Sequence, residues 1–484
     1  MDEGARQDLA ENSPDEDLFD AEIPATPIRR PDSQAAVEAL ARNVLGLAGL
    51  NAAPPALPPR AEQLWRQDGF AADVPFTNAM FVPMGQAADI GLLHESVAAI
   101  VGRHEALRTR LAVRRGRAIQ IAEDWKAGHL EVTDVLQSEI ADLRPGQKSA
   151  VGTFTQGGMD LYAQDGFRCH VFRDENENVT LGFLAHGFFA DARSSHILVR
   201  EIRAAYEALG SGAPAPFEPA VSYAEYALAQ RRSLDRNLSS HLTFWHGLID
   251  NMPPSRLPYD RDEDTGRRGR SFFFVDLRMM ARLEALAQQS RVSLTVLLLA
   301  AYQLSLAKWS GQREILSAAY TADRVDPRFH NTIGFLVANM PVCARIASEG
   351  SFKAFLLDLA KRYYGGFAHR ELSCELYEAI YAPQKPFCAT VFNFIPAQKN
   401  SSGGDLHSIP SFEGVMTAPD AAKPAIYREV YLGLSQHSNG MLGKVFYNAG
   451  RFSPAGIETF IRHFRSVLQK IVSDPDMKTD RLLD

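Results

Sequence analysis

The chain has 484 residues, more than one hydrophobic core usually organises, so two domains of about 200 residues each are expected. Hydrophobic residues make up 46% of the chain and charged residues 23%, as in ordinary globular proteins. The net charge of −7 argues against general nucleic-acid binding, which needs a basic face.

Residues 1–60 are predicted to be a disordered, acidic N-terminus that can hold one short helix. Residues 1 to about 34 offer too little apolar surface to offset the entropy of ordering. The segment 33–50 has helical periodicity, with Ser33 as a candidate N-cap. The proline-rich segment 51–60 is typical of a stiff linker, so the folded body is expected to begin near Ala61.

Residues 61–215 are predicted to form an N-terminal lobe. An amphipathic helix starts at Ile90 and runs into a strand that ends near residue 114, and another strand follows at 118–124. Residues 167–187 predict a β-hairpin. The sequence HGFFADARS then leads into a helix over 194–210, capped by Ser194 or Ser195. A loop with a histidine and an aspartate therefore meets a helix N-terminus at the end of a strand.

Residues 216–484 are predicted to form a C-terminal lobe, because the stretch 210–222 is rich in glycine and proline. A helix opens this lobe, and the helix at 293–311 is apolar on all sides, which indicates burial. Strands are predicted at 270–277, at 314–323 and within 331–346, and a final helix at 453–472. Both lobes combine helices and strands, which allows a cleft between two α+β lobes.

No run of about 18 apolar residues occurs, so no transmembrane helix is expected. The acidic start lacks the basic-then-apolar order of a signal peptide, and a cytoplasmic protein is expected. The histidines and aspartates form no metal-binding motif, so no metal is expected. The four cysteines are expected to be reduced thiols: Cys169, Cys343, Cys374 and Cys388.

Several segments in the right order resemble the condensation domains of nonribosomal peptide synthetases, over roughly residues 61 to 480. These are GRHEALRTRL (102–111), HGFFADARS (186–194), the segment 294–324, NTIGFLVANMPV (331–342) and, loosely, CATVFNF (388–394). This family belongs to the acyltransferase superfamily that includes chloramphenicol acetyltransferase. The resemblance implies two chloramphenicol-acetyltransferase-like lobes in a V-shaped pseudodimer with a central tunnel.

The resemblance also implies partners and a reaction. Acyl or peptidyl carrier proteins deliver substrates on phosphopantetheine arms, and no cofactor is bound directly. An amine, either a small molecule or a second carrier-bound acceptor, attacks the donor thioester, and an amide forms. Neither nucleic acid nor a membrane is an expected partner.

The family's loop has two histidines, three variable residues, an aspartate and a glycine, and its second histidine is usually assigned to catalysis. Here His186 matches the first histidine, Gly187 stands at the second, and Asp191 matches the aspartate. Three interpretations of His186 stay open. It is a structural histidine, or Gly187 permits unusual dihedrals that turn it into the tunnel as the base, or no residue acts as base. His186 is kept as the candidate catalytic residue.

By the same resemblance, Asp191 is expected to form a structural ion pair with Arg324, near Ser194. Arg108 and Asn339 are expected to line the tunnel or to brace the loop. Ser194 is better explained as a helix cap than as a nucleophile. His196, one turn into the helix, is expected to be a surface or lobe-packing residue.

Three functions stay open. The first is a free-standing acyltransferase that joins a carrier-bound acyl thioester to an amine or hydroxyl. A general base contributes typically 10²–10⁴-fold, so a tunnel without the second histidine can still catalyse through positioning. The second is a recruitment module for a carrier protein or a tailoring enzyme. The third is an altered carrier-bound reaction, such as cyclisation. The basic segments 114–117 and 266–270 are candidates for carrier docking.

Overall fold

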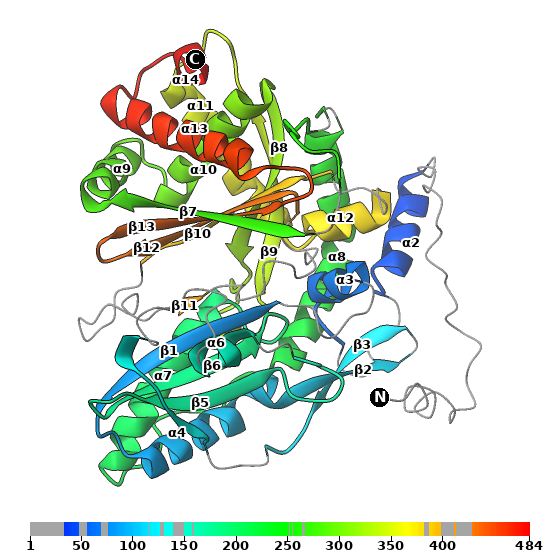
Figure 1. Ribbon diagram of the computed structural model, residues 1–484. Coiled ribbons are helices and arrows are strands. Elements are labelled where there is room, and N and C mark those ends of the chain that lie inside the picture. Colours follow the sequence, from blue (N-terminus) through cyan, green and yellow to red (C-terminus); the bar gives the residue numbers. More distant parts are fainter. Residues whose placement is uncertain are drawn as a thin grey trace.

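The computed structural model describes residues 33–47, 56–68, 76–114, 116–125, 130–138, 150–156, 159–250, 252–253, 255–263, 267–381, 387–397, 411–412 and 428–484. The predicted disorder of residues 1–32 and most of the predicted linker lie outside these ranges. Two sheets build two lobes, one above the other in Figure 1. We call the lobe around the five-stranded sheet the N-terminal lobe and the lobe around the six-stranded sheet the C-terminal lobe.

The sheet of the N-terminal lobe has the strand order β11-β1-β6-β5-β4. Its strands are β1 (Thr77–Gln86), β4 (Val132–Asp134), β5 (Phe167–Arg173), β6 (Asn178–His186) and β11 (Ser411–Phe412). β5 and β6 form the predicted hairpin, and β1 pairs antiparallel with the other side of β6. A separate hairpin consists of β2 (Thr109–Arg114) and β3 (Arg117–Ala122).

Two helices, α4 (Ile90–Arg103) and α7 (Ala192–Gly210), pack against each other in the N-terminal lobe (Figure 1). Their facing sides are apolar, as the 3.6-residue periodicity of both segments predicts. At the end of α4, His104 Nε2 lies 2.7 Å from Glu201 Oε2 of α7, and both side chains are buried. A short helix, α6 (Ala150–Gln156), precedes the hairpin.

The sheet of the C-terminal lobe has the strand order β7-β13-β12-β10-β8-β9. Its strands are β7 (Arg268–Asp276), β8 (Glu314–Ala322), β9 (Val337–Arg345), β10 (Thr390–Ile395), β12 (Val430–His437) and β13 (Gly440–Asn448). β10 is parallel to β8 and β12, and the other pairs are antiparallel. The face away from the N-terminal lobe is covered by α9 (Leu277–Gln289), α10 (Leu294–Ser310), α11 (Phe352–Gly366), α13 (Pro454–Ser473) and α14 (Thr479–Leu483) (Figure 1).

The central helix α10 shows why the sequence predicts this lobe well. Ser293 caps it by accepting a hydrogen bond from Val296 N at 3.3 Å. Every residue from Val296 to Ala307 is buried, as the apolar run on all sides of the helix predicts. Gly311 ends it with a φ of 71°, in the left-handed region that a glycine adopts without strain.

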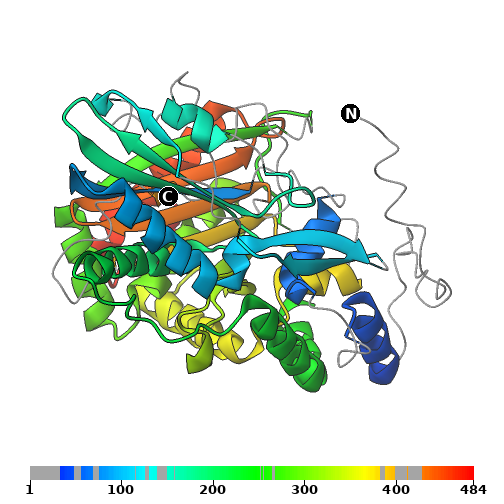
Figure 2. The ribbon, with the colours of Figure 1, turned by 90° about the horizontal axis from the view of Figure 1, so that it is seen from below.

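Three further elements are two helices and the strand β11. The long helix α8 (Tyr223–Ile249) follows the predicted boundary at residue 215, which lies in a stretch without helix or strand. α2 (Gln34–Val44) lies beside α12 (Cys374–Tyr381) in both Figure 1 and Figure 2. β11 comes from the C-terminal half of the chain and pairs with β1, with Phe412 opposite Ala79.

The folded body begins earlier than the predicted Ala61. Ser33 caps α2 as predicted, but the helix ends at Val44 and Gly46 then adopts a φ of 58°. Val37 and Ala41 of α2 are buried, as is Leu57 before the next helix, α3 (Pro59–Gln67). The apolar residues of this segment are therefore part of the core and not of a free tail.

The Glu62 carboxylate joins α3 to two other elements. It accepts hydrogen bonds from Arg66 in the same helix at 3.0 Å and from Arg117 of β3 at 3.1 Å. It also forms an ion pair with Arg231 of α8. Burial raises the pKa of Glu62, but Arg231 and Arg117 outweigh this effect and lower the pKa to about 2.

Within the described ranges, no single helix is long and apolar enough to cross a membrane, although α9 and α10, bent by 105°, reach that length and composition together. The four cysteines all fall in these ranges and are free thiols, as predicted.

Candidate active site

The sequence HGFFADARS forms the end of β6, a short loop and the first turn of α7. β6 ends at His186, and α7 begins at Ala192 with Asp191 as its N-cap. The Asp191 carboxylate accepts a hydrogen bond from Ser194 N at 2.8 Å, which satisfies one N–H group of the first turn. The prediction that Ser194 or Ser195 caps the helix is wrong, because α7 starts two residues earlier and both serines lie inside it.

Asp191 also binds Arg324, which follows β8 in the other lobe. Arg324 Nη1 lies 2.6 Å from Asp191 Oδ2, and Nη2 lies 3.0 Å from Oδ1. Both side chains are buried, and Leu336 N donates a further hydrogen bond to Asp191 Oδ2 at 3.0 Å. The predicted ion pair is therefore present, and it joins the loop after β6 to the C-terminal lobe.

Ser194 takes part in the same contact between the lobes. Its hydroxyl lies 2.8 Å from Asp191 Oδ1, and it accepts hydrogen bonds from Gly334 N at 3.0 Å and Arg324 Nη2 at 3.2 Å. A Cβ on Gly334 would lie 2.2 Å from Cδ2 of Tyr223, so a glycine is what lets this backbone come so close. These contacts hold the Ser194 hydroxyl in the lobe contact.

His186 is completely buried at the end of β6. Its Nδ1 accepts a hydrogen bond from Phe188 N at 3.2 Å, and its ring packs edge-on against Phe76 at 5.8 Å. His186 is not among the residues that line the cavity described below. Its catalytic role stays a prediction, and its position favours the structural interpretation.

The space beside Gly187 is filled by the ring of Phe76. A Cβ on Gly187 would lie 2.1 Å from Phe76 Cε1 and 2.3 Å from Cζ. Gly187 N donates a hydrogen bond to Phe76 O at 2.6 Å, so the two backbones are in contact as well. The Phe76 ring packs edge-on against Phe188 at 5.9 Å and Phe335 at 5.8 Å. A phenyl ring thus occupies the place where a side chain at position 187 would begin.

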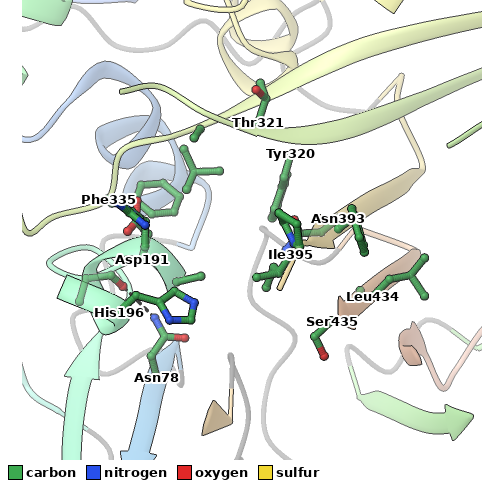
Figure 3. Close-up of a pocket in the computed structure, with 18 of the residues that line it drawn as sticks. Asn78, Asp191, His196, Tyr320, Thr321, Phe335, Asn393, Ile395, Leu434 and Ser435 are labelled. Carbon is green, nitrogen blue, oxygen red and sulfur yellow. Dashed lines mark hydrogen bonds between the residues drawn. The ribbon is translucent and has the colours of Figure 1, made fainter. Parts of the chain in front are cut away.

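A cavity of about 480 Å³ lies beside this loop, between the two lobes (Figure 3). From the N-terminal lobe, its wall includes Phe76, Asn78 and the start of α7. From the C-terminal lobe, it includes residues of β8, β10, β12 and β13. Most of the wall is aromatic or aliphatic. Among the residues that the structure describes, the charged and titratable side chains of the wall are Asp191, Arg193, His196, Tyr320, Arg324, His330, Tyr431 and Lys444.

His196 lines the cavity, although the sequence pattern predicted a surface or lobe-packing role. Ala192 and Arg193 line the cavity too, and His196 follows them at the spacing of one helical turn. The spacing of His196 from Ala192 and Arg193 is visible in the sequence. It indicates a place at the cavity only when the helix is known to begin after Asp191. The side chain of His196 is half-buried, and Figure 3 shows its ring at the cavity wall.

A family model for the condensation domain matches residues 75–483 of this chain. The chain belongs to the condensation-domain family. Condensation domains work with carrier proteins that bear phosphopantetheine, and they typically catalyse amide bond formation. The family membership predicted from the dispersed motifs is confirmed.

The curated proteins that are similar to this chain include nonribosomal peptide synthetases. A linear gramicidin synthase of Brevibacillus parabrevis is 26% identical over 405 residues, which cover 80% of this chain but only 8% of that synthase. The dimodular nonribosomal peptide synthase of Bacillus subtilis is 25% identical over 414 residues, which cover 81% of this chain and 17% of that synthase. The chain thus spans only a small part of the length of these relatives. The relatives are synthases of antibiotic and other secondary-metabolite pathways.

Solved structures confirm the predicted α+β fold of two chloramphenicol-acetyltransferase-like lobes. The condensation domain of the monacolin K polyketide synthase MokA superposes with a TM-score of 0.72 at 18% identity, covering 88% of this chain and 98% of that one. The X-domain from teicoplanin biosynthesis superposes with a TM-score of 0.68 at 18% identity, covering 88% and 97%.

Arg108 and Asn339, two further predicted site residues, do not line the cavity. Arg108 donates a hydrogen bond to Glu123 O at 2.8 Å beside the β2–β3 hairpin. Asn339 Nδ2 donates to Glu375 Oε1 at 2.8 Å, and both side chains are fully buried. Neither residue therefore lies at this cavity, and the expectation that they line the tunnel or brace the loop stays a prediction.

Glu375 links this buried cluster to the cavity wall through Arg60. Arg60 Nε and Nη2 donate hydrogen bonds to the Glu375 carboxylate at 3.1 and 3.2 Å. The Arg60 guanidinium also stacks on the cavity residues Tyr320 and Phe335, 4.8 and 4.9 Å from their ring centroids. Burial raises the pKa of Glu375, but Arg60 and Arg428 outweigh this effect and lower the pKa to about 2.

The two basic segments considered for carrier docking are only partly available at the surface. Arg117 of the first segment is engaged by Glu62. Arg268 of the second segment is buried, with its guanidinium 5.3 Å from the centroid of the Phe446 ring. Arg115 and Gly266 lie outside the described residues.

Proposed function

We propose that this condensation domain transfers an acyl group from a carrier-bound thioester to an amine or hydroxyl acceptor in secondary metabolism. The observation that carries the proposal is the cavity of about 480 Å³ between the lobes. A recruitment module needs no such space. The aromatic and aliphatic wall suits an acyl chain and the aliphatic parts of a phosphopantetheine arm.

Positioning supplies much of the barrier reduction in this proposal. Holding two reactants in contact lowers the reaction barrier by up to about 7–11 kcal/mol, because their translational and rotational freedom is already lost on binding. A thioester is already activated toward amines, so a cavity that aligns the two groups accelerates the reaction without an imidazole at position 187. Carrier proteins are the proposed partners, and the phosphopantetheine arm is the proposed route of delivery.

The recruitment of a tailoring enzyme is the second candidate function. The Phe76 ring beside Gly187 favours it, because it removes the space for the imidazole that the family usually places there. The two functions differ in one measurable outcome. A recruitment module binds a carrier protein without changing the group that the carrier holds.

The test is an acyl-transfer assay with the full chain. Carrier proteins loaded with acetyl, hexanoyl and aminoacyl groups are mixed with a panel of amines, including benzylamine, and mass spectrometry follows both the carrier and the amide. Transfer that requires the protein supports acyl transfer. Tight carrier binding without transfer to any amine of the panel contradicts it and supports recruitment.

A cavity-blocking variant locates the reaction. Ala322 lines the cavity, so Ala322→Trp fills part of it and is expected to lower the rate by roughly 10²-fold through misplacement of the reactants. The matched control is Val325→Trp, because Val325 is 63% exposed and is not part of the cavity wall. Equal rates for the two variants would place the reaction elsewhere.

A further inference from the structure

Among the described residues, two histidines line the cavity, His196 in the N-terminal lobe and His330 in the C-terminal lobe. Imidazole changes its protonation between pH 5 and 8, so it suits a base that works near neutral pH. We infer that His196 is the general base that accepts the proton of the attacking amine. The inference rests on the proposed acyl transfer and assigns a new residue to it.

The first turn of α7 fixes the position of His196 on the cavity wall. His196 stands one helical turn after Ala192 and Arg193, which line the same cavity. The next residues of the helix, Ile197 and Leu198, are buried in the lobe and hold its opposite side. The imidazole therefore has a rigid support, as a base needs if it is to stay within hydrogen-bond reach of its substrate.

Contacts from both lobes hold the start of this helix. Asp191, its N-cap, is held by the two hydrogen bonds from Arg324 of the C-terminal lobe. Asn78 Nδ2 donates a hydrogen bond to Ala190 O at 2.7 Å, which ties the loop to β1. Figure 3 shows the His196 ring on the same side of the cavity as Asn78. His196 and the loop that follows β6 thus lie on the same side of the cavity.

The other groups of the cavity are less suited to this role. Asp191 is engaged by Arg324. His330 is exposed and follows the short η2 (Pro327–Phe329), so its ring is in contact with solvent. Within the described part of the chain, the charged or titratable groups that share the cavity with His196 are Asp191, Arg193, Tyr320, Arg324, His330, Tyr431 and Lys444.

The step balances without any further reactant. The amine nitrogen attacks the thioester carbonyl carbon, and a C–N bond forms while the nitrogen loses a proton to the His196 imidazole. The C–S bond then breaks, and the imidazolium returns the proton to the leaving sulfur. The products are an amide and the free thiol of the carrier arm, and His196 is neutral again.

The experiment is single-turnover transfer from a hexanoyl-loaded carrier protein to the fastest amine of the panel above. His196→Gln keeps a polar side chain that cannot take the proton. It is expected to lower the rate constant by about 10²-fold or more and to leave the carrier dissociation constant unchanged. In the wild type, the rate is expected to fall at acidic pH as the imidazole becomes protonated, and the variant is expected to lose this acidic limb.

His196→Ala provides a second readout, because free imidazole in the buffer is expected to restore part of its rate. His463→Ala is the matched control, since His463 lies on α13 and not at the cavity, and imidazole is expected to have no effect on it. A His196→Gln variant with the wild-type rate and pH profile overturns the assignment while the acyl transfer itself stands. A wild type that binds the carrier but transfers nothing overturns the proposed function.

Discussion

Gly187 and Phe76 form one packing unit at the scale of single residues. The sequence suggested that a glycine at this position permits unusual dihedrals, but its φ does not lie in the left-handed region. The glycine is needed for space, since any Cβ would overlap the Phe76 ring. The change at position 187 and the presence of a phenylalanine at position 76 are therefore two parts of one arrangement.

A double-mutant cycle tests this arrangement. Gly187→Ala is expected to lower the free energy of unfolding by about 1–3 kcal/mol, because the added methyl group must displace the Phe76 ring. In a Phe76→Ala background, the same change is expected to cost about 0.5 kcal/mol or less, because the ring is gone. Urea unfolding of the four proteins measures both values.

The control for this cycle is Gly102→Ala on α4, where a Cβ meets nothing within 4 Å. This change is expected to be neutral or stabilising, as for other glycines in helices. If Gly187→Ala costs the same with and without the Phe76 ring, the packing argument is wrong.

Single residues differ in how far the sequence reveals their roles. The Asp191–Arg324 pair could be predicted from the resemblance, because both residues stand in recognisable motifs. His196 could not, because its spacing places it on a helix without saying which face meets the cavity. The role of Phe76 could not be predicted either, because its ring contacts Gly187 only through the pairing of β1 with β6, which are remote in the sequence.

At the scale of elements, the buried carboxylate of Glu62 is one of the attachments of α3. Glu62 connects it to β3 through Arg117 and to α8 through Arg231. The unfolded chain exposes this carboxyl to water, whereas the fold surrounds it with guanidinium groups. The attachment of α3 therefore depends on the charge of Glu62.

Glu62→Gln is expected to lower the free energy of unfolding at pH 7 by about 3 kcal/mol, from the fall of the pKa from 4.5 to about 2. Because the folded-state pKa is lowered, this stabilisation is fully present above pH 4.5 and is lost as the pH falls toward 2. Urea unfolding at pH 7, 5 and 4 should show a constant difference at the first two values and a smaller one at pH 4.

The exposed Glu349, 3.0 Å from Lys478 Nζ, provides the control. Glu349→Gln is expected to change the free energy of unfolding by less than about 1 kcal/mol at every pH. A Glu62→Gln effect that does not depend on pH would contradict the electrostatic account.

The elements that the sequence predicted share a clear local signal. The β5–β6 hairpin and α10 are defined by their own periodicity and caps. α12 was not predicted, and it is an eight-residue helix that buries Glu375 and Glu378. Carboxylates normally indicate an exposed face. Their burial here depends on arginines that are remote in the sequence.

At the scale of the whole molecule, the two lobes meet at a buried charge pair beside the cavity. Asp191 belongs to one lobe and Arg324 to the other, and Gly334 and Leu336 add backbone hydrogen bonds. A buried ion pair is costly to break from one side, because the remaining charge keeps no partner. The pair therefore fixes how the lobes are placed around the cavity.

Arg324→Met is expected to lower the free energy of unfolding by about 3–5 kcal/mol, since it leaves Asp191 buried and charged. Asp191→Asn combined with Arg324→Met is expected to cost less than Arg324→Met alone. Thermal and urea unfolding of the three variants provide the comparison. The control is Arg345→Met, which removes an exposed pair with Glu314 and is expected to cost less than about 1 kcal/mol.

The double variant decides this prediction. If it is less stable than Arg324→Met, the pair acts through its shape and hydrogen bonds, and the charge argument fails.

The two-lobe architecture was predictable because motifs from both halves occur in order along the chain. The wall of the cavity was not, because it combines side chains from β1, α7, β8, β10, β12 and β13. Each of these strands has its own alternation, but which face meets the opposite lobe depends on how the two sheets are placed.

The strand β11 makes the sheet of the N-terminal lobe depend on the C-terminal half of the chain. A fragment that stops at residue 215 would lack Ser411 and Phe412, and β1 would become an open edge at Ala79 and Met80. Open edges present unpaired N–H and C=O groups that recruit other chains. A strand from the second half of the chain thus covers the edge of the N-terminal sheet. We therefore expect the N-terminal half to aggregate when it is expressed without the C-terminal half.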